Sequence, residues 1–443
     1  MRRDRVQAIV IGAGIGGLTT ALCLHRVGID AVVYESVNRI RPLGVGINLL
    51  PHSVRILTDL GLAGRLDAAA IRTAELAYYN KFGQRIWSEP RGIDAGYRWP
   101  QFSVHRGNLQ MLLYETVVER LGADAIVTGH AVERVATEGD HARVWLVVPA
   151  HAGTQRRSRE DAGFPRARER RETLEAEADI VVAADGIHST VRRQWYPDEG
   201  PPKFAGQLLW RATTVAPKFL SGRTMIMAGH QGQKFVCYPI AHNADGTCVI
   251  NWIAERRIGG TEPPRQSDWN REIDRQTFAP LFANWKFDWL DIPALIAGAD
   301  RVYEFPMVDR DPLPQWTFGR VTLLGDAAHP MYPIGSNGAS QAILDADALA
   351  VALQAESGAQ QGIAAALARY EAERRPATAK IVESNRQMGP ERVMQIVEER
   401  APEGFTDLDA VISRDELESI AAAYKRVAGF DRDALNQRAS AAG

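Results

Sequence analysis

The sequence predicts an α/β fold in which a sheet-and-helix domain is interleaved with a mostly antiparallel sheet and followed by a helical C-terminus. Three observations predict it. Residues 6–35 follow a strand, turn, helix, strand pattern, residues 206–254 contain several alternating strand-like stretches, and helical periodicity dominates after residue 340. The chain has 443 residues, of which 45% are hydrophobic and 24% charged, which is typical of a globular protein with two or three packed domains.

Residues 6–35 predict one βαβ unit of the Rossmann type. An apolar strand leads into Gly12-x-Gly14-x-x-Gly17, a helix follows, and a second strand ends at Glu35. Gly12 permits the tight turn, Gly14 lets the backbone approach a pyrophosphate, and Gly17 allows close helix–strand packing. A carboxylate at Glu35 can accept hydrogen bonds from ribose hydroxyls and would repel a 2′-phosphate. The unit therefore predicts a site for FAD or NAD and not for NADP.

The next elements are less distinctive. Residues 44–66 predict a turn and a helix in which Pro51 suits the first turn, and residues 106–121 predict an amphipathic helix. Residues 150–178 interleave arginines and acids with Gly, Pro and Ser, and we expect a solvated loop or hairpin there. Residues 267–300 are expected to be helical.

A second motif decides between the two dinucleotides. A buried strand over 320–325 ends at Gly325-Asp326, and a glycine-bearing loop leads to a helix that starts near Gly338 and Ala339. A carboxylate at such a strand end can hold the ribityl hydroxyls of a flavin, while free N–H groups at the helix start can face the N1/C2=O edge of the ring. That edge becomes anionic on reduction, so the helix N-terminus favours the reduced flavin. A plain strand–helix connection is what Gly-Asp alone would indicate, but the matched order of the motifs favours FAD.

A third motif is Asp185-Gly186, which follows a buried strand and precedes a helix. Asp185 is expected either to anchor the pyrophosphate region through water or to act only as a cap of the turn.

In this order the motifs resemble those of the class A flavoprotein monooxygenases, the single-component aromatic hydroxylases, over nearly the whole chain. Segments 40–48, 87–92, 105–110, 306–314 and 338–345 are similar to phenazine hydroxylases within that class. The resemblance implies a glutathione-reductase-like flavin domain, NADH or NADPH as a transient electron donor and O2 as cosubstrate. It also implies hydroxylation of a small aromatic or heteroaromatic substrate through a flavin C4a-hydroperoxide, without a catalytic side chain.

The resemblance assigns further cofactor residues. It implies that Arg41 lies in a loop over the flavin, that Arg106 reaches the diphosphate or ribityl region, and that Val132 gives backbone contacts to adenine. For Arg41 and Arg106 the alternative is an ion pair that orders a loop, and His329 is expected to be a packed, hydrogen-bonded turn residue. The full set of expected FAD contacts is Gly12, Ala13, Gly14, Ile15, Gly17, Glu35, Ser36, Arg41, Gly46, Arg106, Val132, Asp185, Gly325, Asp326, Gly338 and Ala339.

The substrate is expected between the flavin edge, beside the loop of Pro333 and Gly335, and the inner face of the antiparallel sheet. Strand alternation puts only some candidates inward, and a plain core role is an even alternative for each. Arg211 should point away from the face of Trp210. If the pocket is apolar, it suits a planar heteroaromatic better than a small benzoate. The expected lining residues are Leu208, Trp210, Met225, Tyr238, Trp252, Met331, Tyr332 and Pro333, with Phe235 and Ile250 as further candidates.

The motifs predict a discontinuous domain organisation. The C-terminal helices are expected either to cover the flavin domain or to form a homodimer face. The FAD-binding domain is assigned residues 1–75, 105–203 and 306–360, the substrate domain residues 76–104 and 204–305, and the C-terminal helices residues 361–443.

Charge and composition argue against other classes. A net charge of -2 leaves no basic footprint for nucleic acid, and no window reaches the ~18 apolar residues of a membrane span. Three scattered cysteines fit a reduced, cytoplasmic compartment, and no cluster has metal-ligand spacing. Epoxidation, Baeyer–Villiger insertion and decarboxylative hydroxylation stay open. So do, from other classes, an NAD-dependent dehydrogenase, a flavin-dependent halogenase and a non-catalytic flavin-binding protein.

Overall fold

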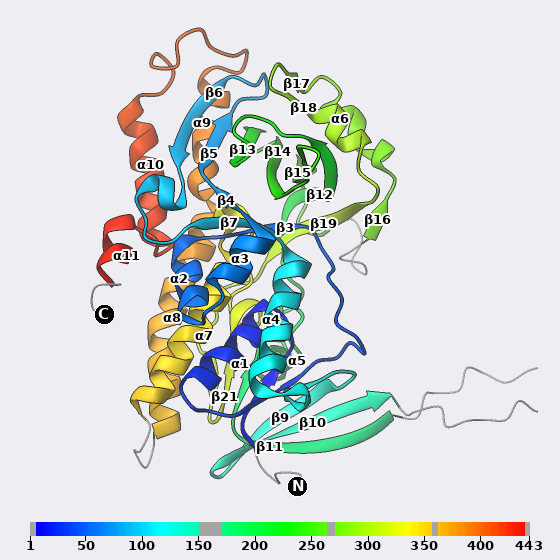
Figure 1. Ribbon diagram of the computed structural model, residues 1–443, viewed down its shortest axis with the longest axis vertical. Helices are drawn as coiled ribbons and strands as arrows, with labels where there is room; N and C mark the ends of the chain where they lie inside the picture. The colour runs from blue at the N-terminus through cyan, green and yellow to red at the C-terminus, as the bar shows by residue number, and fades with distance from the viewer. Residues whose placement is uncertain (1–5, 150–170, 264–270, 357–361, 439–443) are drawn as a thin grey trace, which may run out of the picture.

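Two large sheets lie one above the other along the long axis of the molecule (Figure 1). The computed structural model describes residues 6–149, 171–263, 271–356 and 362–438. We call the lower sheet with its helices, which contains the N-terminal strand and the motifs expected to bind flavin, the flavin half, and the upper sheet, where the substrate is expected, the substrate half. Each of the two sheets has eight strands.

The lower sheet is built from strands that lie far apart in the sequence. Its central order is β21-β11-β1-β2-β8, and these neighbours pair in parallel. The apolar runs suit strands that are covered on both faces. The strands are β1 (Val6–Ile11), β2 (Ala31–Tyr34), β8 (Ile126–Val127), β11 (Arg171–Ala183) and β21 (Val321–Leu323).

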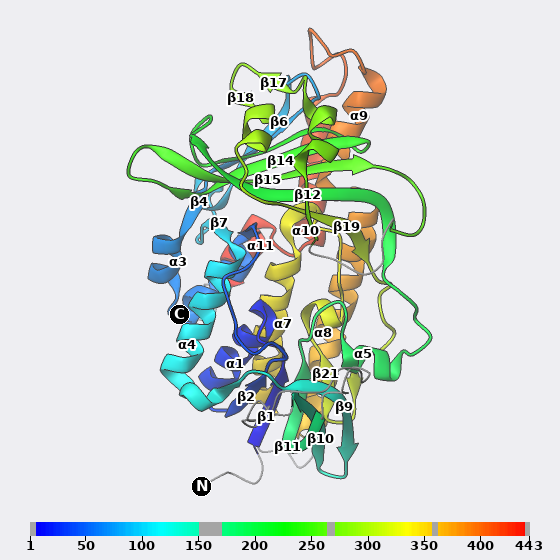
Figure 2. The same ribbon diagram turned by 90° about the vertical axis from the view of Figure 1, so that its right-hand side faces the viewer.

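Long helices cover this sheet. They are α1 (Ile15–Arg26), α4 (Arg106–Leu121), α7 (Gly338–Ala355) and α8 (Gly362–Arg386). α1 packs between α4 and α7, and α8 runs beside α7 (Figure 2). The bounds of α4 are those predicted from its amphipathic pattern.

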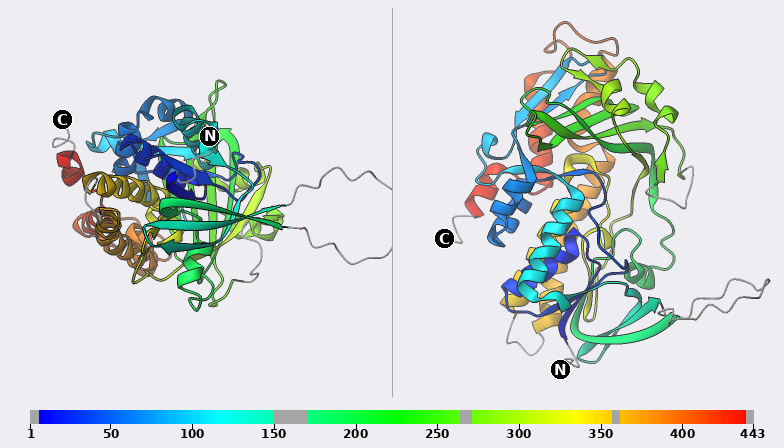
Figure 3. Two further views of the ribbon diagram at one scale, coloured as in Figure 1. Left: turned by 90° about the horizontal axis from the view of Figure 1, so that it is seen from below. Right: turned by 45° about the vertical axis from the view of Figure 1, so that its right-hand side comes forward.

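An antiparallel arm extends from the lower sheet, away from the substrate half (Figure 3). It consists of β9 (Ala131–Glu138), β10 (His141–Pro149) and the first part of β11, paired in that order. Of the predicted charged excursion, residues 171–178 therefore form a strand, which fits the hairpin alternative, while residues 150–170 lie outside the described residues.

The upper sheet has the order β16-β19-β12-β15-β14-β13-β5-β6 and is antiparallel except where β13 meets β5. A smaller sheet of β3, β7 and β4 lies between the two halves. The strands of both sheets are β3 (Gly46–Leu49), β4 (Ala70–Thr73), β5 (Glu75–Tyr79), β6 (Arg85–Pro90), β7 (Gln101–His105), β12 (Lys203–Pro217), β13 (Thr224–His230), β14 (Gln233–His242), β15 (Thr247–Arg257), β16 (Arg271–Ile273) and β19 (Val302–Asp309).

The prediction of helix over residues 267–300 was wrong for most of its described part. Only α6 (Ile292–Ala297) is an α-helix there, among short strands and 3-10 turns. Aromatic residues from these turns pack on the outer face of the upper sheet, as Phe278 does on Trp210 with ring centroids 4.6 Å apart. The apolar residues that suggested a helix are therefore spaced to anchor this irregular segment on the sheet. Pro280 would also interrupt a helix here.

The C-terminal part is helical, as predicted, with a break between α8 and α9. α8 ends at Arg386, Met388 takes a left-handed conformation with φ 71°, and α9 begins after Pro390. α9 packs against the upper sheet, and α10 packs against α8 and α9. These helices therefore connect the two halves. The remaining helices are α2 (Pro51–Asp59), α3 (Ala63–Ala69), α5 (Thr190–Trp195), α9 (Arg392–Arg400), α10 (Arg414–Val427) and α11 (Arg432–Arg438).

The three cysteines are buried and free. Burial raises the pKa of the Cys23 thiol to about 12 and also raises that of Cys237. They act as small apolar residues of the core. Over the described ranges, no helix combines the length and apolar character required to cross a bilayer.

Candidate functional site

The glycine loop after β1 is shaped by close backbone contacts. Gly12 has φ +99°, and a Cβ there would lie 2.6 Å from the carbonyl oxygen of Ala184. A Cβ on Gly17 would lie 1.9 Å from the Gly12 oxygen. By contrast, a Cβ on Gly14 would have no neighbour within 4 Å, so the front of the loop is open to a ligand. The N-terminus of α1 behind it offers the N–H groups that bind phosphate.

Glu35 is folded onto this loop. Its Oε2 accepts a hydrogen bond from Ala13 N–H at 2.8 Å, and its Oε1 accepts one from Val37 N–H at 2.9 Å. Gln110 on α4 donates from Nε2 to the Ala13 carbonyl at 2.8 Å. Ser36 is exposed beside them. Gln110, which the sequence reasoning missed as a site residue, therefore fixes the loop from the opposite side.

The three glycine–carboxylate motifs meet at one edge of the lower sheet. Ile11 is paired with Ala183, and Ala183 with Leu323, so the turns after these three strands lie side by side. Carboxyl ends of parallel strands are where such folds bind dinucleotides. The strand order thus assembles Gly12, Asp185 and Asp326 at one site.

Asp185 serves as a cap and also keeps a free oxygen. Its Oδ2 accepts from Thr190 N–H at 2.8 Å, at the start of α5. Its Oδ1 is buried and has no hydrogen-bond partner among the described residues. Burial raises the pKa of this carboxyl. The geometry fits both roles weighed from the sequence, a cap and an anchor for a polar group.

Asp345 on α7 fixes the Gly325 turn from inside. Its Oδ2 accepts from Gly325 N–H at 3.0 Å and lies 2.5 Å from His329 Nε2, while Arg374 Nε donates to Oδ1 at 2.7 Å. Burial opposes ionisation of Asp345, but His329 and Arg374 outweigh it and lower the pKa to about 2. His329 is a packed turn residue, as predicted. Asp345 was missed, although a buried acid within a run of small apolar residues was a usable signal.

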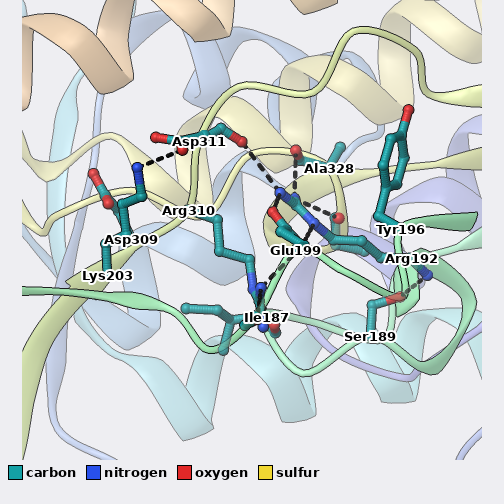
Figure 4. Close-up of polar contacts among 12 residues, drawn as sticks. Ile187, Ser189, Arg192, Tyr196, Glu199, Lys203, Asp309, Arg310, Asp311 and Ala328 are labelled. Atoms are coloured by element: carbon teal, nitrogen blue, oxygen red, sulfur yellow. Dashed lines mark hydrogen bonds and ion pairs between the residues drawn. The ribbon is translucent and has the colours of Figure 1, made fainter. Parts of the chain in front are cut away.

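Arg192 joins the second and third motifs (Figure 4). This buried residue of α5 donates from Nη1 to the carbonyls of Ala327 and Ala328 at 3.1 and 2.9 Å. Its guanidinium also forms an ion pair with Glu199. The helix that begins after Asp185 is thereby attached to the turn that carries Asp326. The sequence reasoning did not find this role.

Asp326 and Arg106 lie open at the same edge. Asp326 is exposed, yet desolvation by the surrounding protein raises its pKa, which the charges of His329 and Arg106 partly offset. Arg106, the first residue of α4, and Arg41 in the loop before β3 are exposed. Neither makes an ion pair with a residue in the described ranges. The structure thus shows no sign of the loop-ordering ion pairs that were the alternative for both.

The N-terminus of α7 faces the same region with free donors. A Cβ on Gly338 would meet nothing within 4 Å, and Asn337 makes no side-chain cap. Val132 lies half-buried on β9. Gly46 differs from expectation, because Asn251 Oδ1 accepts from its N–H at 2.6 Å and Arg211 donates to its carbonyl at 3.2 Å. Gly46 therefore joins the two sheets through both of its backbone polar groups, and its contact with FAD stays a prediction.

A flavin dinucleotide fits this donor set. The open glycine loop suits its pyrophosphate, the unpaired Asp326 carboxylate suits its ribityl hydroxyls, and the first turn of α7 suits the electron-rich edge of its ring.

Comparison with known proteins agrees with this fit. A family model described as "FAD binding domain" matches residues 5–385. The chain belongs to this family of FAD-binding proteins. A phenazine 1,6-dicarboxylic acid hydroxylase of Lysobacter antibioticus is 45% identical, with 86% of this chain and 89% of that protein covered. A 3-amino-4-hydroxybenzoate 2-monooxygenase of Streptomyces cremeus is 31% identical, with 87% of each chain covered. The protein is an FAD-dependent monooxygenase.

A solved structure shows the same fold. HpxO of Klebsiella pneumoniae, complexed with FAD and uric acid, aligns with a TM-score of 0.68 at 23% identity, covering 97% of this chain and 96% of that one.

A cavity of this monooxygenase lies between the loop before α7 and the inner face of the upper sheet. Gly335 and Ser336 line one side, and Met225 and Met227 of β13 line the other. Leu50, at the start of α2, contributes a third wall. Its enclosed part has a volume of about 20 Å³, room for one water-sized group, and the empty space reaches about 390 Å³ when the open mouth is counted.

Only part of the predicted substrate set lies on this side. Met225, Tyr238 and Tyr332 belong to one cluster on the inner face. Met331 and Pro333 lie on the loop before α7, where Met331 is half-buried and Pro333 is exposed.

Leu208, Trp210 and Trp252 were expected in the pocket, but they point to the outer face and pack in its separate core. Phe235 and Ile250 lie there too. Strand alternation predicted which residues share a face of the sheet, but not which of the two faces is the inner one. The outer face is covered by an irregular segment whose sequence did not predict this packing.

Arg211 lies opposite Trp210, as predicted, which puts it on the inner side. It reaches the Gly46 carbonyl, and its Nε is buried without a hydrogen-bond partner among the described residues. Burial lowers its pKa.

Tyr424 of α10 shapes the loop that borders the cavity. Its Oη lies 3.1 Å from the Ile334 carbonyl and 2.9 Å from Asn385 Oδ1, and it accepts from Asn337 Nδ2 at 2.8 Å. Gly335 has φ +68°, and a Cβ there would lie 1.9 Å from this hydroxyl. A C-terminal helix thus fixes the loop expected beside the flavin, which sequence reasoning missed.

Proposed function

We propose that this monooxygenase hydroxylates a fused, phenazine-type heteroaromatic bound in the cavity between the loop at Gly335 and the inner face of the upper sheet. The observation that carries the proposal is the position of that cavity, with methionines of β13 facing the loop that precedes α7. The relative named for a phenazine dicarboxylic acid supports the substrate class.

We assign the cofactor roles as follows. Asp326 binds the ribityl hydroxyls, Glu35 the adenosine ribose, and Arg106 the diphosphate or ribityl region. Val132 contacts the adenine through its backbone. Arg41 contacts the outer side of the flavin. Bound FAD stores the electrons taken from NADH or NADPH and activates O2, while the chain orients the substrate and excludes water.

The walls of the cavity suit a planar ring system. Met225 and Met227 present unbranched thioether side chains, which adapt to flat aromatic faces, and Leu50 adds apolar surface. Such walls keep water from the reacting atoms. The positive end of the α7 dipole supports negative charge on the flavin edge without a side-chain base.

The deciding experiment is anaerobic stopped-flow reduction of the holoenzyme by NADH and by NADPH, with phenazines, quinolines and hydroxybenzoates as ligands. We expect a phenazine to speed flavin reduction more than the other two classes. A purified protein without a flavin absorption band, or reduction that no ligand accelerates, would contradict the proposal.

Product mass spectrometry then separates the possible outcomes of oxygen insertion. A product that retains every substrate carbon indicates hydroxylation or epoxidation, and loss of a carboxyl group indicates decarboxylative hydroxylation. A cytoplasmic location, where NADH and NADPH are available, and a homodimer remain expectations.

A further inference from the structure

A group of charged side chains lies on the cavity wall formed by β6 and α10. Arg91, just after β6, has Nη2 2.5 Å from Glu89 Oε1, and Lys425 Nζ donates to Glu89 Oε2 at 2.6 Å. Arg91 and Glu89 are only 7% and 6% exposed, and all three residues line the cavity. Burying charges is costly unless each is compensated, so this group needs an explanation.

Three polar atoms in the same wall have no hydrogen-bond partner among the residues that the structure describes. They are Tyr78 Oη, Arg91 Nε and Gln101 Oε1. Tyr78 is 1% exposed and Gln101 2% exposed, and both line the cavity with Arg91. A buried donor without a partner costs roughly 1–3 kcal/mol, so these atoms point to a ligand that pairs with them.

The charges do not balance within this group. Burial opposes ionisation of Glu89, but Arg91 and Lys425 together lower its pKa, so one negative charge faces two positive charges. The nearby Glu391 belongs to a separate buried group, in which it shares Lys234 with Glu255, and among the described residues it forms no ion pair with Arg91 or Lys425. An anion in the cavity would complete the group.

We propose that Arg91 and Tyr78 bind a carboxylate of the heteroaromatic substrate, which places the substrate's ring against Met225 and the loop at Gly335. The proposal rests on the proposed function and narrows its substrate class to aromatic carboxylates. Arg91 supplies Nε–H, Tyr78 its hydroxyl, and Lys425 adds positive charge across Glu89. The Gln101 amide can present its NH2 group after rotation.

The test uses two matched ligands, phenazine-1-carboxylate and its neutral carboxamide. Their dissociation constants are measured from the change in flavin absorption of the oxidised holoenzyme, without turnover. We expect the carboxylate to bind at least about tenfold more tightly, because hydrogen bonds to charged groups are the stronger ones.

Tyr78→Phe is the most informative variant. The Tyr78 hydroxyl has no hydrogen-bond partner to lose among the described residues, so the variant should fold and bind FAD normally, while the preference for the carboxylate falls by about tenfold. Arg91→Gln should reduce it further. Tyr79→Phe is the control, because Tyr79 is the next residue of β5 and points into the outer core, so the preference should not change.

Equal binding of the two ligands by the wild type, or an unchanged preference in Tyr78→Phe, would overturn this inference. The proposed function survives either result as long as both ligands accelerate flavin reduction. If neither ligand binds or accelerates reduction, the proposed function fails together with the inference.

Discussion

Two aspartates around one turn illustrate how neighbouring residues take different tasks. Asp345 is enclosed with His329 and Arg374, and its pKa falls to about 2. Asp326 is open toward the groove and has no hydrogen bond to a described residue, and desolvation raises its pKa. The first holds the backbone in place, and the second is left available to a ligand. The Gly-Asp pattern indicated Asp326, whereas Asp345 acts through contacts that only the folded chain creates.

We expect Asp326→Asn to weaken FAD binding at least about tenfold, because an amide replaces a charged acceptor of two ribityl hydroxyls. Equilibrium titration of apoprotein with FAD, followed by flavin fluorescence, measures the change. Asp347→Asn is the control, since Asp347 lies on α7, outside the Gly325 turn, and pairs with Arg26 and Arg55. Equal FAD affinity in the Asp326 variant and the control would refute the assignment.

Asp345→Asn should lower the free energy of unfolding by about 3 kcal/mol at neutral pH, because it leaves Arg374 buried without its counter-charge. The folded pKa of about 2 lies below the ordinary value of about 3.9 in an unfolded chain, so Asp345 contributes stability above that value and loses it as the pH falls toward 2. Urea unfolding at several pH values measures this. The difference between the variant and the wild type should shrink with acidification; a constant difference would contradict the argument.

Among the secondary-structure elements, local signals predicted helices better than they predicted sheet faces. The helix at 106–121 has the predicted bounds, since amphipathic spacing acts within the helix itself. The face of Trp210 could not be predicted, because alternation is symmetric and the covering segment at 271–291 is irregular. The loop at Gly335 depends on Tyr424, far along the chain.

The loop should therefore be sensitive to a single methyl group. Gly335→Ala places a Cβ against the Tyr424 hydroxyl at a left-handed backbone position, so we expect at least about a tenfold loss of substrate-dependent NADH oxidation. FAD content should fall less. Gly64→Ala, where a Cβ would meet nothing within 4 Å, is the matched control. Normal turnover in Gly335→Ala would show that the loop tolerates displacement.

At the scale of the whole molecule, the halves are joined through β3. Asn251 of β15 accepts from Gly46 N–H, and a Cβ on Gly46 would lie 2.6 Å from that side chain. The flavin half was predictable because its motifs have fixed spacing after strands. The substrate cavity was not, since β5, β6, β13 and α10 supply its walls from distant parts of the sequence.

We expect Asn251→Ala to lower the free energy of unfolding by roughly 1–3 kcal/mol, because the buried Gly46 N–H loses its acceptor. Circular dichroism and flavin fluorescence, followed through the same urea titration, measure the change in both halves. Asn243→Ala in the turn after β14 is the control. If Asn251→Ala changes stability no more than the control, the contact is not what joins the halves.

The parallel pairing of β1 with β11, and of β11 with β21, has a consequence for synthesis. Translation proceeds at about 5–20 residues per second, so β1 waits many seconds before β11 leaves the ribosome and longer before the Gly325 turn does. Until then one apolar edge of β1 is unpaired, and such edges invite pairing with other chains. The set of residues that we assign to FAD is complete only after α7 has emerged, which makes flavin loading a late event in synthesis.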